Sequence, residues 1–293
     1  MNGLMVVNSS LRHWLALWHT PGIGAKRFFQ LQQVFPQLEE LFTLPATALS
    51  KLDLPAQSVA AIRTPAWHAV DRHIEWAELP GHSIITSAYP LLLKQTVGPP
   101  ALLFVQGDPL YINLPQLAIV GSRNPSPRGI ETAYHFAQQL AQSGLVITSG
   151  LALGIDAVSY QAALSVKRPT VAVLGCGLDR IYPRSHRKMA EQIIAQGALV
   201  SEHALGTPPL AQNFPQRNRI VSGLSLGVLV VEATVRSGSL ITARLAAEQN
   251  REVFAIPGSD SYSVLLLKRH YLLTSWLNAL AYPLPLLLRI YVY

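Results

Sequence analysis

Glycine, serine and arginine follow several short apolar runs in the second half of the chain. The first run ends at Val120 and leads into Gly121-Ser122-Arg123, and a later run leads into a small-residue segment at 149–156. Similar segments lie at 175–179 and 232–240. Backbone N–H groups exposed at the start of a helix hold phosphates, and small residues let the phosphate approach. These segments therefore indicate a binding site for a phosphate-bearing ligand.

Basic side chains recur in the same segments. Arg123 follows the first run, and Arg217 and Arg219 follow Phe214 in a later one. Residues 180–188 contain no acid and four basic residues: Arg180, Arg184, Arg187 and Lys188. A cationic groove with an aromatic ring suits a single nucleic-acid strand, because phosphates pair with Arg and Lys while a base stacks on the ring. By composition alone, residues 180–188 fit a solvated helix start equally well.

Familiar catalytic, cofactor and metal motifs are missing from the sequence. No G-x-G-x-x-G opens the first helix of the predicted core, and Gly175-Cys176-Gly177 lacks the third glycine. The Walker A, H-E-x-x-H and G-x-S-x-G patterns do not occur either. His135, His186 and His203 lie in separate segments, which favours core or surface roles over metal binding. We therefore expect no cofactor and no metal ion.

The apolar runs predict the elements that position these segments. Six candidate buried strands lie at 117–120, 145–148, 170–174, 198–200, 228–231 and 253–256. Helical stripes separate them, at 133–140, 155–166, 187–195, 217–224 and 239–248. Strands without polar alternation, each separated from the next by a helix, indicate an α/β fold with a Rossmann-like parallel sheet and helices on both faces. Ligands bind such sheets at the carboxyl ends of the strands, so we expect the small-residue segments to share one edge.

Residues 1–85 show a different pattern, that of short helices. Ser10 is expected to cap a helix whose apolar stripe consists of Leu11, Trp14, Leu15 and Trp18. Residues 21–28 then resemble a helix-hairpin-helix, in which glycines allow a tight turn and the next helix points its amides at a phosphate. A plain packing turn is the alternative interpretation of the same residues.

The charge of the chain is unevenly distributed. The 293 residues include 23 Lys and Arg and 16 Asp and Glu, a net charge of +7. Residues 1–85 are neutral overall, residues 86–260 carry +4 and residues 261–293 carry +3. The excess favours a polyanionic partner without identifying one. A single cysteine, Cys176, excludes an intramolecular disulfide framework and is typical of a protein in a reducing cytosol.

In order and spacing, these segments together resemble the DNA-processing protein A (DprA/Smf) family. The stretches that match lie at 120–123, 149–156, 175–183, 201–202, 214–220, 231–233, 237–243 and 256–259. They cover roughly residues 90–259, and as a set they are highly specific. The helical N-terminal part also resembles the sterile-alpha-motif-like (SAM-like) domain that precedes this core in the family.

The resemblance implies a cytosolic, non-catalytic protein that binds single-stranded DNA. It further implies that the protein protects incoming strands and helps to load the RecA recombinase in natural transformation and recombination, as a homodimer and without a membrane partner. The DNA contacts of the family carry over to Gly121, Ser122, Arg123, Phe214, Arg217, Asn218 and Arg219. Charge placement, rather than the resemblance, adds Arg184 and Lys188.

The resemblance also suggests how the chain is divided. We expect a helical SAM-like domain at 1–85, a Rossmann-like DNA-binding core at 86–259 and an atypical apolar tail at 260–293. The winged-helix domain that often follows the core in the family is expected to be absent. Tyr160 stands where the family usually has a histidine, which puts a local helix contact in question.

The tail departs most from the family, since residues 261–293 contain no glycine and no acid. A frameshifted or truncated reading frame is the preferred interpretation, because the match stops abruptly. A membrane anchor is the second, although the uncharged stretch at 271–288 is marginal in length and Pro283 and Pro285 would break a helix. A divergent docking segment is the third. The self-association surface of the family lies near this end of the core.

Two other functions stay open. Residues 237–243 together with Glu248 distantly resemble the nucleotide phosphoribohydrolases, whose glycine-rich loop and glutamate hold a nucleoside monophosphate, but the doubled glycine of those enzymes is absent. Release of free base from adenosine monophosphate would favour this enzyme, whereas retention of an oligo-dT strand without turnover would favour the binding protein. A nonfunctional remnant caused by the altered tail is the other possibility, and a sharp cooperative melt would argue against it.

We predict that Arg123→Ala or Arg217→Ala weakens the binding of single-stranded DNA. Each lost phosphate contact makes the log–log dependence of affinity on salt shallower by roughly 0.7. A salt titration of oligo-dT binding measures both changes. An affinity that the substitution leaves unchanged contradicts the assignment of that residue.

Overall fold

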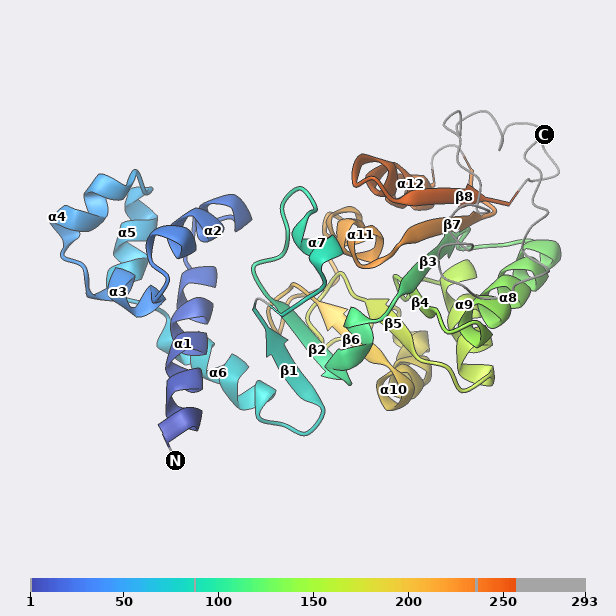
Figure 1. Cartoon of the computed structure of the whole chain (residues 1–293), viewed down its shortest axis with the longest axis horizontal. Helices are drawn as coiled ribbons and strands as arrows, with labels where there is room; N and C mark the ends of the chain where they lie inside the picture. Colours follow the sequence, from blue (N-terminus) through green and yellow to red (C-terminus); the bar gives the residue numbers. More distant parts are fainter. Residues whose placement is uncertain (1, 87, 235–236, 257–293) are drawn as a thin grey trace.

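The computed structural model describes residues 2–86, 88–234 and 237–256. The tail at 260–293 and the end of the last matching stretch, 257–259, lie outside the described residues. Figure 1 shows a group of N-terminal helices beside a twisted sheet that further helices surround. Within the part of the chain that the structure describes, no helix is both long and apolar enough to span a membrane.

Short helices build the N-terminal part. They are α1 (Asn2–Trp18), α2 (Ala25–Val34), α3 (Leu38–Thr43), α4 (Ala46–Leu49), α5 (Ala56–Arg63) and α6 (Trp67–Ala77), with the 3-10 turn η1 (Ser50–Leu52) after α4. The expected cap at Ser10 is wrong, because α1 begins at Asn2 and Ser10 lies inside it. Leu4 and Met5, ahead of Ser10, are good helix formers that extend the helix. The predicted stripe does face the interior, where Leu15 is fully buried.

The turn before α2 is closely packed. Gly22 has a φ of +80°, and a Cβ there would lie 2.9 Å from Ser58 Oγ. The Ser58 hydroxyl donates a hydrogen bond to the Pro21 carbonyl at 2.6 Å. These contacts are those of a packing turn, and they add no support to the helix-hairpin-helix interpretation.

The described residues form an eight-stranded sheet in the order β1-β2-β6-β5-β4-β3-β7-β8. Six of these strands are parallel and confirm the predicted runs: β3 (Gln116–Gly121), β4 (Val146–Ser149), β5 (Thr170–Val173), β6 (Ala198–Ser201), β7 (Gly227–Val231) and β8 (Glu252–Ala255). Every residue of β4, β5, β6 and β7 is buried. Because both faces are covered, these strands show no polar alternation.

Two further strands, which the sequence did not predict, make the sheet mixed. Strand β1 (His82–Ile85) pairs antiparallel with β2 (Leu103–Gly107), and β2 pairs antiparallel with β6. Antiparallel strands need no long crossover helix between them, so the alternation that marks the parallel strands does not reveal this pair. The sheet therefore begins at His82, inside the range 1–85 that the sequence assigns to the helical domain.

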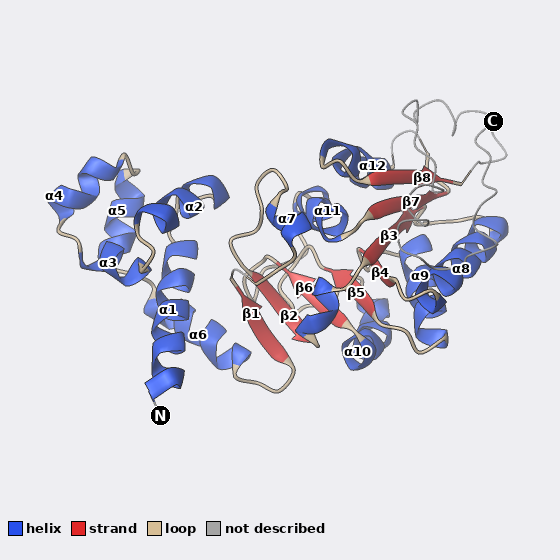
Figure 2. Cartoon of the chain, viewed as in Figure 1, coloured by secondary structure: helices blue, strands red, loops and turns tan. Residues whose placement is uncertain are grey.

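Helices cover both faces of the sheet, as predicted (Figure 2). Helices α8 (Pro127–Gln142), α9 (Ile155–Ser165) and α10 (Arg187–Gln196) lie on one face, and α7 (Leu91–Lys94), α11 (Asn213–Leu224) and α12 (Gly238–Glu248) lie on the other. Alternate residues of β3 serve the two layers: Ile119 packs against α8 and α9, whereas Ala118 and Val120 pack against α11 and α12. The 3-10 turns η2 (Pro109–Asn113) and η3 (Arg184–His186) lie in connecting loops.

The N-terminal helices pack onto the sheet through β2. The ring of Phe104 contacts the rings of Trp18, His73 and Trp76, at centroid distances of 5.7, 5.1 and 5.6 Å. His73 is fully buried, and its Nε2 accepts a hydrogen bond from the backbone N–H of Leu205 at 3.3 Å. Leu205 belongs to the loop after β6, so the N-terminal helices also hold a loop at the carboxyl edge of the sheet.

We predict that the melting temperature falls as the pH is lowered from about 7 to about 5. Burial lowers the pKa of His19 to about 4 and also lowers the pKa of His73 and His203. Below the ordinary histidine value of about 6.5, the unfolded chain takes up protons that the folded protein does not, so stability declines with pH in this window. Calorimetry at a series of pH values measures the effect.

His19→Gln provides the control, because it removes one of the three groups. The variant should show a smaller fall in melting temperature over the same pH range. A wild-type melting temperature that stays constant between these pH values contradicts the prediction.

Candidate nucleic-acid interface

The carboxyl ends of the parallel strands meet at one edge of the sheet, as predicted. Strand β3 ends at Gly121, β4 at Ser149, β5 at Val173 and β7 at Val231, and the register places Gly121 beside Val231. A Cβ at Gly121 would overlap the Val231 carbonyl oxygen and would lie 2.6 Å from the Ile155 side chain. Glycine at this position lets α9 begin directly against the end of β3.

Ser122 and Arg123 form the start of the first loop. The Ser122 carbonyl accepts a hydrogen bond from the Ile155 N–H at 3.0 Å, and its hydroxyl oxygen accepts one from the Asn124 N–H at 3.1 Å. Gly154, with a φ of +78°, packs against the same carbonyl, where a Cβ would overlap the oxygen. The backbone is thus fixed, while the Arg123 side chain is exposed.

Glu232 closes the N-terminal end of α8. Its carboxylate accepts hydrogen bonds from the Ser126 N–H at 2.9 and 3.1 Å and from the Ser126 hydroxyl at 2.7 Å. The Ser126 hydroxyl oxygen in turn accepts one from the Gly129 N–H at 3.1 Å. A helix N-terminus favours negative charge. The carboxylate of the protein itself therefore takes the place that a phosphate could take at this helix.

Asp156 organises the loop after β4. Its buried carboxylate accepts hydrogen bonds from the N–H groups of Gly150 and Ala152, at 2.9 and 3.1 Å. Burial raises the pKa of Asp156, and the nearby guanidinium of Arg217 opposes that shift. The small-residue segment at 149–156 is thus folded around a carboxylate rather than left open.

Arg217 lies at the predicted edge but beneath its surface, since the residue is only 4% exposed. Its Nη1 donates hydrogen bonds to the carbonyls of Gly150, at 2.6 Å, and of Val173. Burial lowers the pKa of Arg217, and the charge of Asp156 opposes the shift. The sequence placed this side chain against DNA. In the structure it joins the loop after β4 to the end of β5 instead.

Phe214 lies beside Arg217 near the start of α11. The helix begins at Asn213, earlier than the predicted stripe, and Asn213 Nδ2 anchors it by donating to the Gly175 carbonyl at 3.1 Å. The half-buried Phe214 ring lies 5.6 Å from the ring of Tyr182 and 5.9 Å from the guanidinium carbon of Arg217. Tyr182 is 49% exposed. The two rings offer an aromatic surface at the edge of the sheet.

A hollow of about 500 Å³ adjoins Tyr182, and we call it the arginine hollow. Its lining consists of Asp179, Arg180, Ile181, Tyr182, Arg184, Arg187 and Pro209. Arg180 Nε lies 3.9 Å from Asp179 Oδ2, whereas Arg184 and Arg187 are exposed and have no hydrogen-bond or ion-pair partner among the described residues. Lys188 follows Arg187 in α10 and is also exposed, but it does not line the hollow. Uncompensated cations around a hollow attract phosphates.

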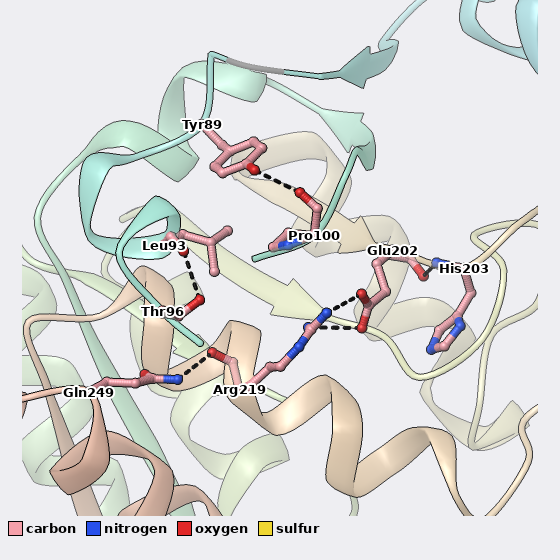
Figure 3. A network of polar contacts seen from close by, with 9 residues as sticks. Tyr89, Leu93, Thr96, Pro100, Glu202, His203, Arg219 and Gln249 are labelled. Atoms are coloured by element: carbon pink, nitrogen blue, oxygen red, sulfur yellow. Dashed lines mark hydrogen bonds and ion pairs between the residues drawn. The ribbon is translucent and has the colours of Figure 1, made fainter. Parts of the chain in front are cut away.

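The next two residues of α11 point elsewhere. Asn218 Nδ2 donates a hydrogen bond to the Gly238 carbonyl at 3.4 Å. Arg219 forms a bidentate ion pair with Glu202, with Nη1–Oε1 at 2.9 Å and Nη2–Oε2 at 2.5 Å (Figure 3). The Arg219 carbonyl also accepts a hydrogen bond from Gln249 Nε2 at 3.2 Å. The sequence placed Arg219 among the DNA contacts, but in the structure Glu202 compensates its charge.

Two residues that the sequence singled out for other reasons belong to the core. The His186 ring nitrogen Nδ1 lies 3.0 Å from the Leu151 carbonyl oxygen, and His186 is buried. Tyr160 is fully buried, and its hydroxyl donates to the Val171 carbonyl at 3.4 Å, so the core accommodates this departure from the family. Within the described ranges, no group of three His, Cys, Asp or Glu side chains could hold a metal ion.

Glu248 does not join the glycine-containing loop with which the phosphoribohydrolase interpretation pairs it. The residue ends α12, an 11-residue helix that begins at Gly238, so about 15 Å of helix separates the two ends. Its carboxylate pairs with Arg244 at 3.1 Å, and its side chain is 56% exposed. The structure offers no observation in favour of a nucleotide held between these groups.

Four residues take part in the interface although the sequence gave them no role: Asp156, Tyr182, Glu202 and Glu232. Each lies inside one of the matching stretches. Glu202 and Glu232 directly follow β6 and β7, whereas Asp156 and Tyr182 lie seven and nine residues beyond the ends of β4 and β5. A polar residue directly after a buried strand is the signal that could have identified Glu202 and Glu232, since ligands and loop contacts gather there.

The interface has the sequence and the fold of a known family. A family model described as DNA recombination-mediator protein A matches residues 82–264. The chain belongs to this family. Protein Smf of Escherichia coli is 52% identical over 194 residues, which are 65% of this chain and 52% of that protein. DNA processing protein DprA of Bacillus subtilis is 45% identical over 183 residues, which are 61% of this chain and 62% of that protein. The chain thus spans less than two thirds of these relatives.

Solved structures of the DprA family share the fold. The structure of DprA from Streptococcus pneumoniae matches with a TM-score of 0.74 and 32% identity, over 87% of this chain and 88% of that one. A Helicobacter pylori DprA structure, described as giving insight into a unique single-stranded DNA binding mode, matches with a TM-score of 0.58 and 32% identity, over 63% and 84%. These similarities confirm the predicted α/β core of the DprA family.

We predict that Arg217→Ala lowers the free energy of unfolding by about 1–3 kcal/mol, as expected when buried acceptors lose their hydrogen-bond donor. The carbonyls of Gly150 and Val173 would lose their donor, and Asp156 would lose its nearby cation. Urea unfolding measures the change. The double variant Asp156→Asn with Arg217→Met removes both charges and should recover part of the loss.

Arg123→Ala is the matched control for stability, because that side chain is exposed and should change the free energy of unfolding by less than about 0.5 kcal/mol. Equal urea midpoints for the Arg217→Ala variant and the wild type would contradict the role of Arg217.

Proposed function

We propose that this chain is a non-catalytic protein that binds single-stranded DNA along the carboxyl edge of its sheet. The observation that carries the proposal is the arginine hollow beside the Tyr182–Phe214 ring pair. Arg184 and Arg187 there are exposed and uncompensated among the described residues. Phosphates pair with such cations, and a base stacks on an aromatic ring regardless of sequence.

The residues divide into contacting and positioning groups. Arg123, Arg184 and Lys188 are exposed and bind phosphates, and the half-buried ring of Phe214 stacks on a base. Gly121 and Ser122 fix the loop that carries Arg123. The remaining expected contacts, Arg217, Asn218 and Arg219, hold the interface from beneath through the contacts described above.

The wider role of the family supplies the rest of the proposal. The chain protects incoming single strands in the cytosol and helps to load the RecA recombinase during natural transformation and recombination, as a homodimer. Membership of the DNA recombination-mediator family supports this role. So does the similarity to the Helicobacter pylori relative whose structure concerns single-stranded DNA binding.

Paired variants test the binding mode. Arg184→Ala should lower the affinity for oligo-dT and make the salt dependence shallower by roughly 0.7, because one phosphate contact is lost. Phe214→Ala should weaken binding by about 1–3 kcal/mol while leaving the salt slope unchanged, because stacking releases no counterions. Fluorescence anisotropy across a salt series separates the two effects.

Arg168→Ala is the matched control. Arg168 is also an exposed arginine, but it lies just before β5, at the opposite edge of the sheet. The proposal fails if the wild-type chain retains no oligo-dT, or if Arg168→Ala reduces affinity and salt slope as much as Arg184→Ala does.

A further inference from the structure

One imidazole of the N-terminal helices reaches a loop at the carboxyl edge of the sheet. His73 lies on α6 and is buried, and its Nε2 accepts the hydrogen bond from the Leu205 N–H at 3.3 Å. Leu205 lies 132 residues further along the chain, in the loop that follows β6. The contact therefore joins the helical part directly to the edge along which we place the DNA strand.

The neutral form of His73 is the one that fits this contact. Its Nδ1 lies 2.6 Å from the Ala69 carbonyl oxygen, and because a carbonyl only accepts, Nδ1 carries the proton. Nε2 is then unprotonated and accepts from the Leu205 N–H. Protonation of the ring would place a hydrogen on Nε2, directly opposite that N–H. The charged ring would therefore repel the loop that the neutral ring holds.

The surroundings of His73 determine when it takes up that proton. Burial lowers its pKa, the hydrogen bond to Ala69 and the charge of Asp179 raise it, and the charge of Arg72 lowers it. On α1, His19 Nε2 lies 3.4 Å from His73 Nδ1, and the two rings disfavour each other's protonation. The contact with the loop is thus complete above the ordinary histidine value of about 6.5 and weakens as the pH falls below it.

The loop that contains Leu205 forms part of the wall of the arginine hollow. The Gly206 N–H donates a hydrogen bond to Asp179 Oδ1 at 2.8 Å, and Asp179 and Pro209 both line the hollow. A shift of the loop would move Pro209 and release the Asp179 carboxylate. That carboxylate is then free to compensate Arg180, whose Nε now lies 3.9 Å from Asp179 Oδ2. Both changes reduce the attraction of the hollow for a phosphate.

We propose that His73 is a positioning residue for the DNA site: its neutral ring holds the loop at Leu205 against the arginine hollow and makes strand binding sensitive to pH. The inference rests on the proposed function. It gives the N-terminal helices a task at the edge of the sheet that requires no contact between them and the DNA. Protonation of one buried ring then weakens binding at a distance from the strand.

Titrations of oligo-dT binding at fixed ionic strength test this role on the full chain, from about pH 7.5 to about pH 5. At the higher pH, His73→Leu should lower the affinity about fivefold, the loss expected for one hydrogen bond. His73→Gln should bind like the wild type there, because an amide oxygen can also accept the Leu205 N–H. At the lower pH, the ratio of wild-type to His73→Gln affinity should fall about threefold, since glutamine takes up no proton.

His68→Gln is the matched control, because His68 is an exposed histidine of the same helix, and this variant should keep the pH dependence of the wild type. Comparing two variants at each pH removes the general gain in attraction to phosphate that other protonated histidines cause. Without DNA, residues 203–210 should exchange their amide hydrogens faster in the wild type than in His73→Gln at the lower pH.

An affinity ratio that stays constant with pH, or equal hydrogen exchange in the two proteins, overturns the role of His73 and leaves the proposed function intact. If His73→Leu does not fold, the comparison of the wild type with His73→Gln decides the question alone. A wild-type chain that retains no oligo-dT at the higher pH overturns the proposed function, and the role of His73 with it.

Discussion

One buried cation holds the carboxyl edge of the sheet together. Arg217 is almost completely removed from solvent, which opposes its charge, and the edge compensates it with two backbone carbonyls and the nearby carboxylate of Asp156. Such an arrangement is stable only when every partner stays in place, because an uncompensated buried charge is very unfavourable. The loop after β4, the end of β5 and the start of α11 are therefore fixed relative to one another. The exposed side chains that these segments carry are therefore held in defined positions as well.

Helix α11 contacts several segments along the edge of the sheet. Successive residues of an α-helix point about 100° apart, so Arg217, Asn218 and Arg219 reach three different parts of the structure. The first reaches the loop after β4 and the end of β5, the second reaches the start of α12, and the third reaches Glu202 after β6. Three neighbouring polar residues thus position the rim and carry little of the exposed positive charge. That charge lies mainly on Arg123 and on the segment from Arg180 to Lys188, where the net excess of the core can face a polyanion.

The sequence predicts the strands and the edge well but not the depth of individual side chains. Parallel strands that helices cover on both faces have a continuous apolar pattern, so β3 to β8 are recognisable, and the edge follows from their common direction. The pair β1–β2 is missed because antiparallel pairing depends on contacts that no crossover helix marks. A position after a strand indicates the edge on which Arg217 lies, yet it cannot show that other loops cover the guanidinium. Likewise, the ion pair of Arg219 depends on Glu202, which lies in the loop after β6 and is 17 residues away in the chain.

The carboxylate of Glu232 at the start of α8 has a wider consequence. In folds of this architecture the helix after the first central strand commonly grips the phosphates of a small nucleotide. Here the Glu232 carboxylate already occupies that helix N-terminus, through its hydrogen bonds from Ser126. In the proposed binding mode the strand lies across the rim of the sheet edge, and a polymer held that way has no end that needs threading. A strand lying there would remain accessible along one side, and another protein could take it over segment by segment while it is still bound.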